Sequence, residues 1–148
     1  MSEGSARILA LDLGEARIGV ALSDPLGMTA QPLGALRRRG SRQDPEAVAA
    51  LAREHGAAEI VVGHPLLLSG EAGTRAKDAE AFADGLRRAA PELRVELLDE
   101  RFTTVEVERA MIAGGVRRKR RREVVDSLAA TLILQSYLAR RDARDGAE

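Results

Sequence analysis

The chain has 148 residues, enough for one domain with a hydrophobic core and too few for two. Its 23 basic and 23 acidic residues give a formal net charge of zero. The absence of cysteine excludes disulfide bonds, thiolate catalysis and cysteine-ligated zinc. No stretch approaches the roughly 20 apolar residues of a membrane span, and residues 1–5 lack the apolar segment of a signal peptide. We therefore expect a cytoplasmic protein with no membrane association.

The first half of the chain alternates short aliphatic runs with turn signals. These runs predict four strands, at residues 7–13, 18–22, 31–37 and 58–62. The first two strands should form a hairpin around Gly14. Apolar residues at helical spacing predict a helix over 44–55, with Asp44 as its cap and Pro45 at its first position.

The second half of the chain predicts further helices and one more strand. An apolar stripe predicts a helix over 72–90, and residues 95–98 form a fifth strand. The Thr-x-x-Glu signature at 103–106 predicts a capped helix that stops at Gly114-Gly115. The basic run at 117–122 is expected as a loop, followed by a last helix over about 123–140.

This order of elements predicts a single α/β domain over 7–140, with a mixed five-stranded sheet flanked by helices. Residues 1–6 and 141–148 are expected as terminal tails. In open α/β sheets, ligands bind beyond the carboxyl ends of the strands, which is where chemistry-bearing side chains should gather.

Four acidic residues lie at the ends of predicted core elements. Asp12 ends the first aliphatic run, Asp99 and Glu100 end the fifth strand, and Asp126 opens the last apolar helix. An unpaired carboxylate at the margin of a core costs several kcal/mol, so a shared partner is indicated. With two histidines and no cysteine, that partner is better a hard cation, Mg²⁺ or Mn²⁺, than zinc. Two such ions roughly 4 Å apart can activate water for phosphodiester hydrolysis.

Each acidic residue also has a purely structural explanation, which the sequence leaves open. Asp12 could be a turn residue before Gly14, and Asp99 or Glu100 could pair with Arg101 at a strand end. Asp126 lies in the first turn of a helix, where the helix dipole favours an acid. The joint placement of these residues, rather than any one of them, favours a metal site.

Basic residues form two clusters despite the neutral total. One is the unbroken run Arg117, Arg118, Lys119, Arg120, Arg121 and Arg122, and the other joins Arg37, Arg38, Arg39 and Arg42. The run directly precedes Asp126, which favours docking of phosphates over a merely solvated loop. Because the chain has only two Phe, one Tyr and no Trp, base stacking is disfavoured and contact with a nucleic-acid backbone is expected.

The motifs resemble those of a known family. Leu11-Asp12-Leu13-Gly14, the segments 17–24 and 61–65, the motif Asp99-Glu100-Arg101-Phe102-Thr103-Thr104 and the segment 126–138 together resemble the YqgF family. These proteins are described as pre-16S rRNA nucleases and as Holliday junction resolvase-like. The resemblance spans about residues 7–139 and implies a ribonuclease H-like fold with a metal-dependent nuclease site.

The resemblance also assigns roles to residues of this chain. It implies that Asp12, Glu100 and Asp126 form the catalytic acidic triad. The metal ligands then come from Asp12, Asp99, Glu100 and Asp126, because adjacent strand residues point to opposite faces and leave open which of Asp99 and Glu100 is the ligand. Arg17, Arg101 and the run from Arg117 to Arg122 are the expected nucleic-acid-binding residues.

The expected function is hydrolysis of phosphodiester bonds during 5′-end maturation of pre-16S rRNA. Its partner would be precursor rRNA or the small ribosomal subunit, and the protein would be a monomer or weak homodimer. One alternative is a Holliday junction resolvase, which requires a two-fold dimer for two symmetric cuts. A second is a non-catalytic rRNA-binding assembly factor. A third is an actin-like or sugar-kinase ATPase, suggested by Asp12-Leu13-Gly14 alone.

Overall fold

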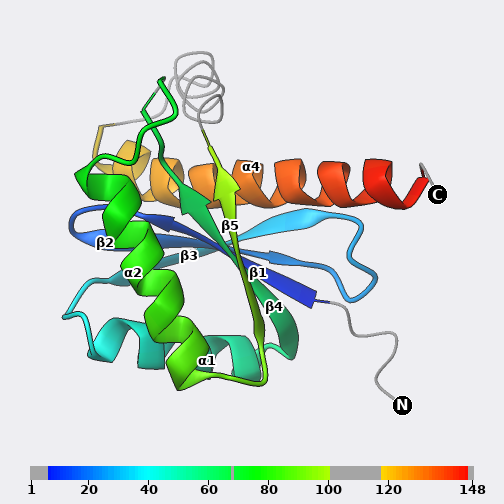
Figure 1. The fold of residues 1–148 in the computed structure, drawn as a ribbon, viewed down its shortest axis with the longest axis horizontal. Coiled ribbons are helices and arrows are strands. Elements are labelled where there is room, and N and C mark those ends of the chain that lie inside the picture. Colours follow the sequence, from blue (N-terminus) through cyan, green and yellow to red (C-terminus); the bar gives the residue numbers. More distant parts are fainter. Residues whose placement is uncertain (1–6, 68, 101–117, 147–148) are drawn as a thin grey trace.

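The computed structural model describes residues 7–67, 69–100 and 118–146, and within the last range only the side chains of 127–141 are described. Figure 1 shows the arrangement of its elements. The strands are β1 (Arg7–Leu13), β2 (Arg17–Ser23), β3 (Ala30–Arg37), β4 (Ala57–His64) and β5 (Arg94–Asp99). The helices are α1 (Gln43–Glu54), α2 (Thr74–Ala89) and α4 (Arg118–Gly146).

The strands form one mixed sheet in the order β3-β2-β1-β4-β5. The first three strands are an antiparallel meander, and β4 and β5 run parallel to β1. The mixed five-stranded sheet predicted from the sequence is thereby confirmed. Because β1, β4 and β5 are parallel, their carboxyl ends lie at the same edge of the sheet.

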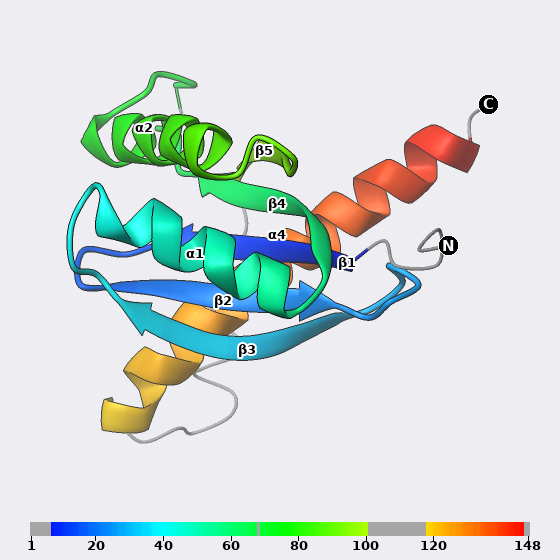
Figure 2. The same cartoon turned by 90° about the horizontal axis from the view of Figure 1, so that it is seen from below.

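Helices cover both faces of the sheet (Figure 2). On one face, Val48 of α1 and Phe82 of α2 pack in a core cluster with strand residues such as Leu9 and Leu11. On the other face, Ala130 and Ile133 of α4 pack in a second cluster with Ile8, Ala10, Val61 and Leu98. Small residues on both α4 and β1 let that helix approach the sheet closely.

Three local predictions differ from the structure. The basic run was expected as a loop, but residues 118–122 belong to α4, since Arg and Lys are good helix formers and neither Gly nor Pro occurs between Gly115 and Gly146. The same helix continues over 141–146, which were expected as a tail. Asp44 does not cap α1 from outside; it lies in the first turn and accepts hydrogen bonds from the backbone N–H groups of Arg39 and Gly40.

Two other predictions cannot be compared with the structure. The tail at residues 1–6 and the helix expected between Thr103 and Gly114 both lie outside the described residues. Within the described residues, no helix combines the length and apolarity that crossing a membrane requires.

Candidate active site

Asp12 lies on the α4 face of the sheet, near the carboxyl end of β1. Side chains alternate along a strand, and Ile8 and Ala10 both belong to the cluster packed against α4. Asp12 continues this series and is paired with Gly19 of β2. Its side chain is partly buried. The alternation predicts an apolar residue at position 12 on the α4 face, and the chain has an acidic residue there instead.

Glu100 reaches the same face from β5, on the far side of β4. Leu98 of β5 packs in the α4 cluster, and Glu100 follows two residues later. Its backbone N–H donates to the carbonyl of His64 at 3.2 Å, which continues the strand pairing beyond Asp99. Only 7% of Glu100 is exposed. The carboxylate is therefore inserted into the protein and not displayed on the surface.

Gly63 of β4 provides the space that Glu100 occupies. A side chain at this position would overlap both the Oε2 atom of Glu100 and the Cδ1 atom of Ile133 in α4. Because β4 lies between β1 and β5, a glycine here lets the carboxylate from one outer strand extend toward the other. Residue 63 is thus a glycine because the Glu100 carboxylate and the Ile133 side chain approach its backbone too closely for a Cβ atom.

The electrostatics of Glu100 indicate a site prepared for a positive charge. Burial, followed by the charge of Asp12, raises the pKa of Glu100 from its ordinary 4.5 to about 7, and the charge of Arg75 partly opposes this rise. Asp99 also raises this pKa, with a smaller effect than Asp12. Two carboxylates that lie close together in a poorly solvated site repel each other unless a proton or a cation lies between them. Asp12 and Glu100 form such a pair.

The alternation of side chains separates Asp99 from this pair. Leu97 packs against the cluster of α1 and α2, so Asp99 belongs to that face of β5, whereas Leu98 and Glu100 belong to the α4 face. Asp99 is paired in register with His64, whose Nε2 atom lies 2.8 Å from Glu80 Oε2 of α2. The geometry thus groups Glu100, and not Asp99, with Asp12.

Asp126, the predicted third member of the triad, belongs to α4, and its side chain lies outside the described part. It comes four residues before Ala130 and seven before Ile133, which pack on the sheet. Arg101, Arg117 and the side chains of residues 118–122 also lie outside the described part. Among the described residues, no group of three acidic or histidine side chains could hold a metal ion. The third ligand therefore stays a prediction.

Arg75 is a candidate site residue that the sequence reasoning missed. Its guanidinium donates to the carbonyl of Leu13 at 3.2 Å, and its charge lowers the pKa of Glu100. One signal was available in the sequence, because Arg75 lies in the first turn of α2, where the helix dipole disfavours a cation. Together with Glu100 it lines a pocket of about 340 Å³, whose other lining residues are Pro65, Leu66, Leu67, Gly73 and Thr74.

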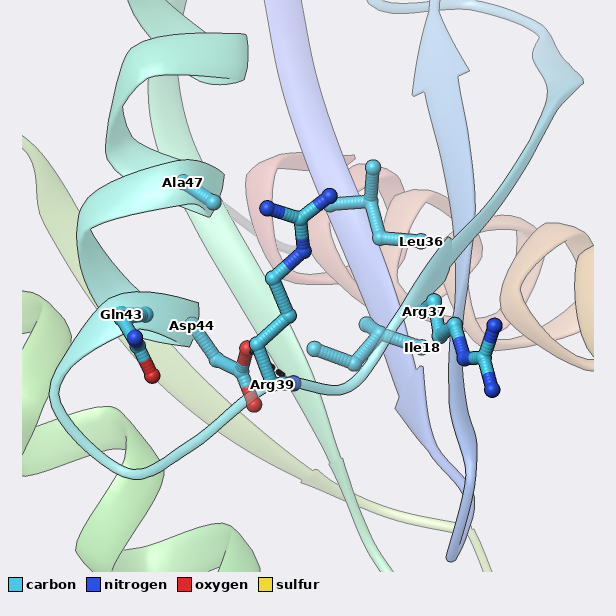
Figure 3. Close-up of a pocket in the computed structure, with 7 residues that line it drawn as sticks. All are labelled: Ile18, Leu36, Arg37, Arg39, Gln43, Asp44 and Ala47. Carbon is cyan, nitrogen blue, oxygen red and sulfur yellow. Dashed lines mark hydrogen bonds between the residues drawn. The ribbon is translucent and has the colours of Figure 1, made fainter.

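A second pocket, of about 440 Å³, lies between α1 and the end of β3. Figure 3 shows Arg39 between Ala47 of α1 and Leu36 of β3, while the Arg37 side chain points away from α1. The lining residues are Ile18, Leu36, Arg37, Arg39, Gln43, Asp44 and Ala47. This pocket is separated from Glu100 by the sheet itself.

The fold defines the class of protein first. Solved structures of *Thermus thermophilus* RuvC superpose with TM-scores of 0.52, for a complex with a Holliday junction substrate, and 0.51. Each is 16% identical; the first covers 91% of this chain and 95% of RuvC, and the second covers 92% and 96%. At this identity the likeness concerns the fold alone, which is ribonuclease H-like, as predicted.

The sequence then defines the family. The RuvX family, described as Holliday junction resolvase, matches residues 6–140, and this chain belongs to it. Over 133 residues the chain is 49% identical to a *Pelotomaculum thermopropionicum* protein named "Putative pre-16S rRNA nuclease", covering 89% of this chain and 86% of that protein. A protein of the same name from *Moorella thermoacetica* is 48% identical over 134 residues, covering 90% and 95%. The resemblance drawn from the motifs is confirmed.

Proposed function

We propose that this protein is a metal-dependent nuclease that hydrolyses phosphodiester bonds in the 5′ region of precursor 16S rRNA. The observation that carries the proposal is the buried Glu100 carboxylate, whose pKa is raised to about 7 beside Asp12 at the carboxyl edge of the sheet. Membership of the RuvX family and the names of the 48–49% identical relatives support the substrate class.

The donor set fits a hard divalent cation. Asp12 and Glu100 offer only carboxylate oxygens, which suit Mg²⁺ or Mn²⁺, and their mutual repulsion would be relieved by either ion. Asp126 is the proposed third ligand. We leave Asp99 out of the proposed set, because alternation along β5 puts it on the face of α1 and α2. Such an ion, when bound, activates a water molecule and neutralises charge on the reacting phosphate.

The chain's own residues orient the substrate around this pair. Arg75, held at the Leu13 carbonyl, is placed to neutralise a phosphate next to Glu100. Gly63 and the His64 carbonyl fix the position of Glu100, so little reorganisation is needed when substrate binds. Arg101 and the basic residues of 117–122 are proposed to hold the flanking backbone, with affinity that falls steeply as salt increases.

Cleavage of a precursor 16S rRNA fragment tests the proposal. The purified full chain should cut the RNA in the presence of Mn²⁺ or Mg²⁺ and stop cutting when EDTA is added. Asp12→Asn, Glu100→Gln and Asp126→Asn should each abolish cleavage while circular dichroism stays unchanged. Asp99→Asn is the matched control on the other face of β5 and should retain most activity. Full cleavage by Asp126→Asn would contradict the proposed triad.

Holliday junction resolution is the second candidate, favoured by the description of the RuvX family. It requires two symmetric active sites, so it predicts a dimer in light scattering and paired cuts in a four-way DNA junction. A monomer that cuts only the rRNA fragment would exclude it. Metal-independent binding of the small ribosomal subunit or its rRNA, without turnover, would instead indicate a non-catalytic assembly factor.

A further inference from the structure

Three consecutive arginines at the end of β3 have three different environments. Arg38 is a structural residue: its Nη1 atom donates to the Gly14 carbonyl at 3.0 Å and to Asp78 at 2.8 Å. Arg39 lies on the α1 side and lines the pocket of Figure 3. Arg37 is exposed and points away from α1. The cluster seen in the sequence is therefore not a single patch.

Strand register places Arg37 beside Arg17 on the α4 face of the sheet. The two residues are Cα partners in the β2–β3 ladder, next to the pair Ile18 and Leu36, which faces α1. Alternation thus turns both arginines toward the face that carries Asp12, since Gly19, two residues from Arg17, is the partner of Asp12. From strand spacing and rise, the Cα atoms of Arg17 and Arg37 lie about 8 and 12 Å from that of Asp12.

The pairing of two arginines opposes folding. Like charges directly opposite each other in a sheet are destabilising. Neither guanidinium has a hydrogen-bond or ion-pair partner among the side chains that the structure describes, whereas Arg38 between them in the chain is fully engaged. A repulsive cation pair next to an acidic site is readily explained by an anionic ligand that bridges it.

We propose that Arg17 and Arg37 form a phosphate-binding pair that holds the substrate backbone on the β3 side of Asp12 and Glu100. This inference rests on the proposed nuclease function and adds Arg37 to its binding surface. With Arg75 at the Leu13 carbonyl and in the pocket that Glu100 lines, the substrate strand crosses the carboxyl edge of the sheet from the start of α2 toward β3. The phosphates at the pair flank the bond that is cut.

Binding without turnover tests this arrangement. Fluorescence anisotropy of the full chain with a labelled single-stranded precursor 16S rRNA fragment is measured in EDTA over a series of salt concentrations. Arg17→Gln and Arg37→Gln should each weaken binding about fivefold at low salt and reduce the salt slope by about one. Arg37→Lys should restore most of the affinity. Arg39→Gln, from the same arginine run but the α1 face, is the matched control and should change affinity less than twofold.

The RNA affinity and the melting temperature of the Gln variants decide whether Arg17 and Arg37 form a binding pair. Equal losses of RNA affinity for Arg37→Gln and Arg39→Gln would indicate diffuse electrostatic attraction rather than a defined binding pair, and would overturn the inference. A marked fall in the melting temperature of Arg37→Gln would show that Arg37 serves the fold, and would overturn it too; an unchanged or higher melting temperature supports it. If the wild type binds and cuts RNA while both Gln variants behave normally, only this inference fails. If the wild type neither binds nor cuts the RNA, the result contradicts the proposed nuclease function itself.

A labelled four-way DNA junction in the same assay separates the two sources of phosphate backbone. A loss of affinity on RNA supports the pair in the proposed nuclease. A loss confined to the junction would overturn the assignment to an RNA strand.

Discussion

The carboxylate of Glu100 occupies the space that a side chain on Gly63 would need. Gly63 belongs to β4, Glu100 directly follows the neighbouring parallel strand β5, and the third parallel strand, β1, carries Asp12. A side chain at the middle strand would fill the gap across which the two carboxylates influence each other. The raised pKa of Glu100 therefore depends on a glycine that has no charge of its own.

Gly63→Ala should damage both the site and the packing of α4. The added methyl group meets Glu100 Oε2 and Ile133 Cδ1, so either the carboxylate or the helix must move. We expect a loss of about 1–3 kcal/mol in the free energy of unfolding, measured in urea, and at least a tenfold fall in cleavage rate. Gly73→Ala is the control for stability, because its methyl group would lie at an ordinary 3.6 Å from Leu67. An equal loss in the free energy of unfolding for both variants would contradict this account of Gly63.

Glu100→Gln should stabilise the metal-free protein at alkaline pH while it abolishes activity. The folded-state pKa is raised to about 7 from an ordinary 4.5, so the stabilising contribution is complete below about pH 4.5 and is lost as pH rises through 7. Between these pH values, the free energy of unfolding of the metal-free wild type should fall by up to about 3 kcal/mol more than that of the Gln variant. Melting temperatures at pH 5 and pH 8 measure the difference.

Added Mg²⁺ or Mn²⁺ provides the complementary measurement. If Glu100 and Asp12 hold the ion, it should raise the melting temperature of the wild type more at pH 8 than at pH 5, because the ligands are then ionised. Glu100→Gln should show a much smaller rise at both pH values. Equal stabilisation of the two proteins would place the ion elsewhere.

The fold was largely predictable because the sheet is built from patterned segments. Residues 7–13 and 58–62 are aliphatic runs ended by turn residues, and the stripe from Ala76 to Leu86 has the period of a helix, so burial alone selects these elements. The prediction of a loop at the basic run is wrong, because a high charge density does not by itself disfavour a helix. Arginine and lysine are good helix formers, and α4 is supported by its apolar packing further along.

The site was predictable only in part. Asp12 and Glu100 could be located because acids at strand ends interrupt an apolar pattern, whereas choosing Glu100 over Asp99 required the face of β5, which Leu97 and Leu98 reveal in the structure. Arg75 was missed because its contact with Leu13 joins residues far apart in the sequence. The opposition of Arg17 and Arg37 likewise depends on strand register, which sequence patterns do not specify to one residue.

Arg75→Gln should shift the pH dependence of cleavage to higher pH. Arg75 lowers the pKa of Glu100, so its removal leaves burial and Asp12 less opposed and raises that pKa above about 7. The ionised carboxylate is the form that binds a cation. At sub-saturating Mg²⁺, the cleavage rate of the variant should therefore begin to rise at a higher pH than that of the wild type. Profiles of kcat/KM against pH measure this shift. Arg88→Gln, at the far end of α2, should match the wild type.

Arg38→Gln should destabilise the fold far more than changes to its neighbours. Arg38 holds the β1–β2 turn through the Gly14 carbonyl, pairs with Asp78 at 2.8 Å and with Asp44 at 3.6 Å, and lies over the ring of Phe82. Asp44 is only 4% exposed, so it would keep its backbone hydrogen bonds but lose its nearest cation.

We expect Arg38→Gln to reduce the free energy of unfolding by about 2–3 kcal/mol, and Arg39→Gln to change it by less than about 0.5 kcal/mol, both measured by urea denaturation. Because Asp78 is exposed, a double-mutant cycle between Arg38 and Asp78 should return a coupling below about 1 kcal/mol. A larger coupling would mean that the exposed pair, rather than Gly14 and the buried Asp44, accounts for the stability that Arg38 provides.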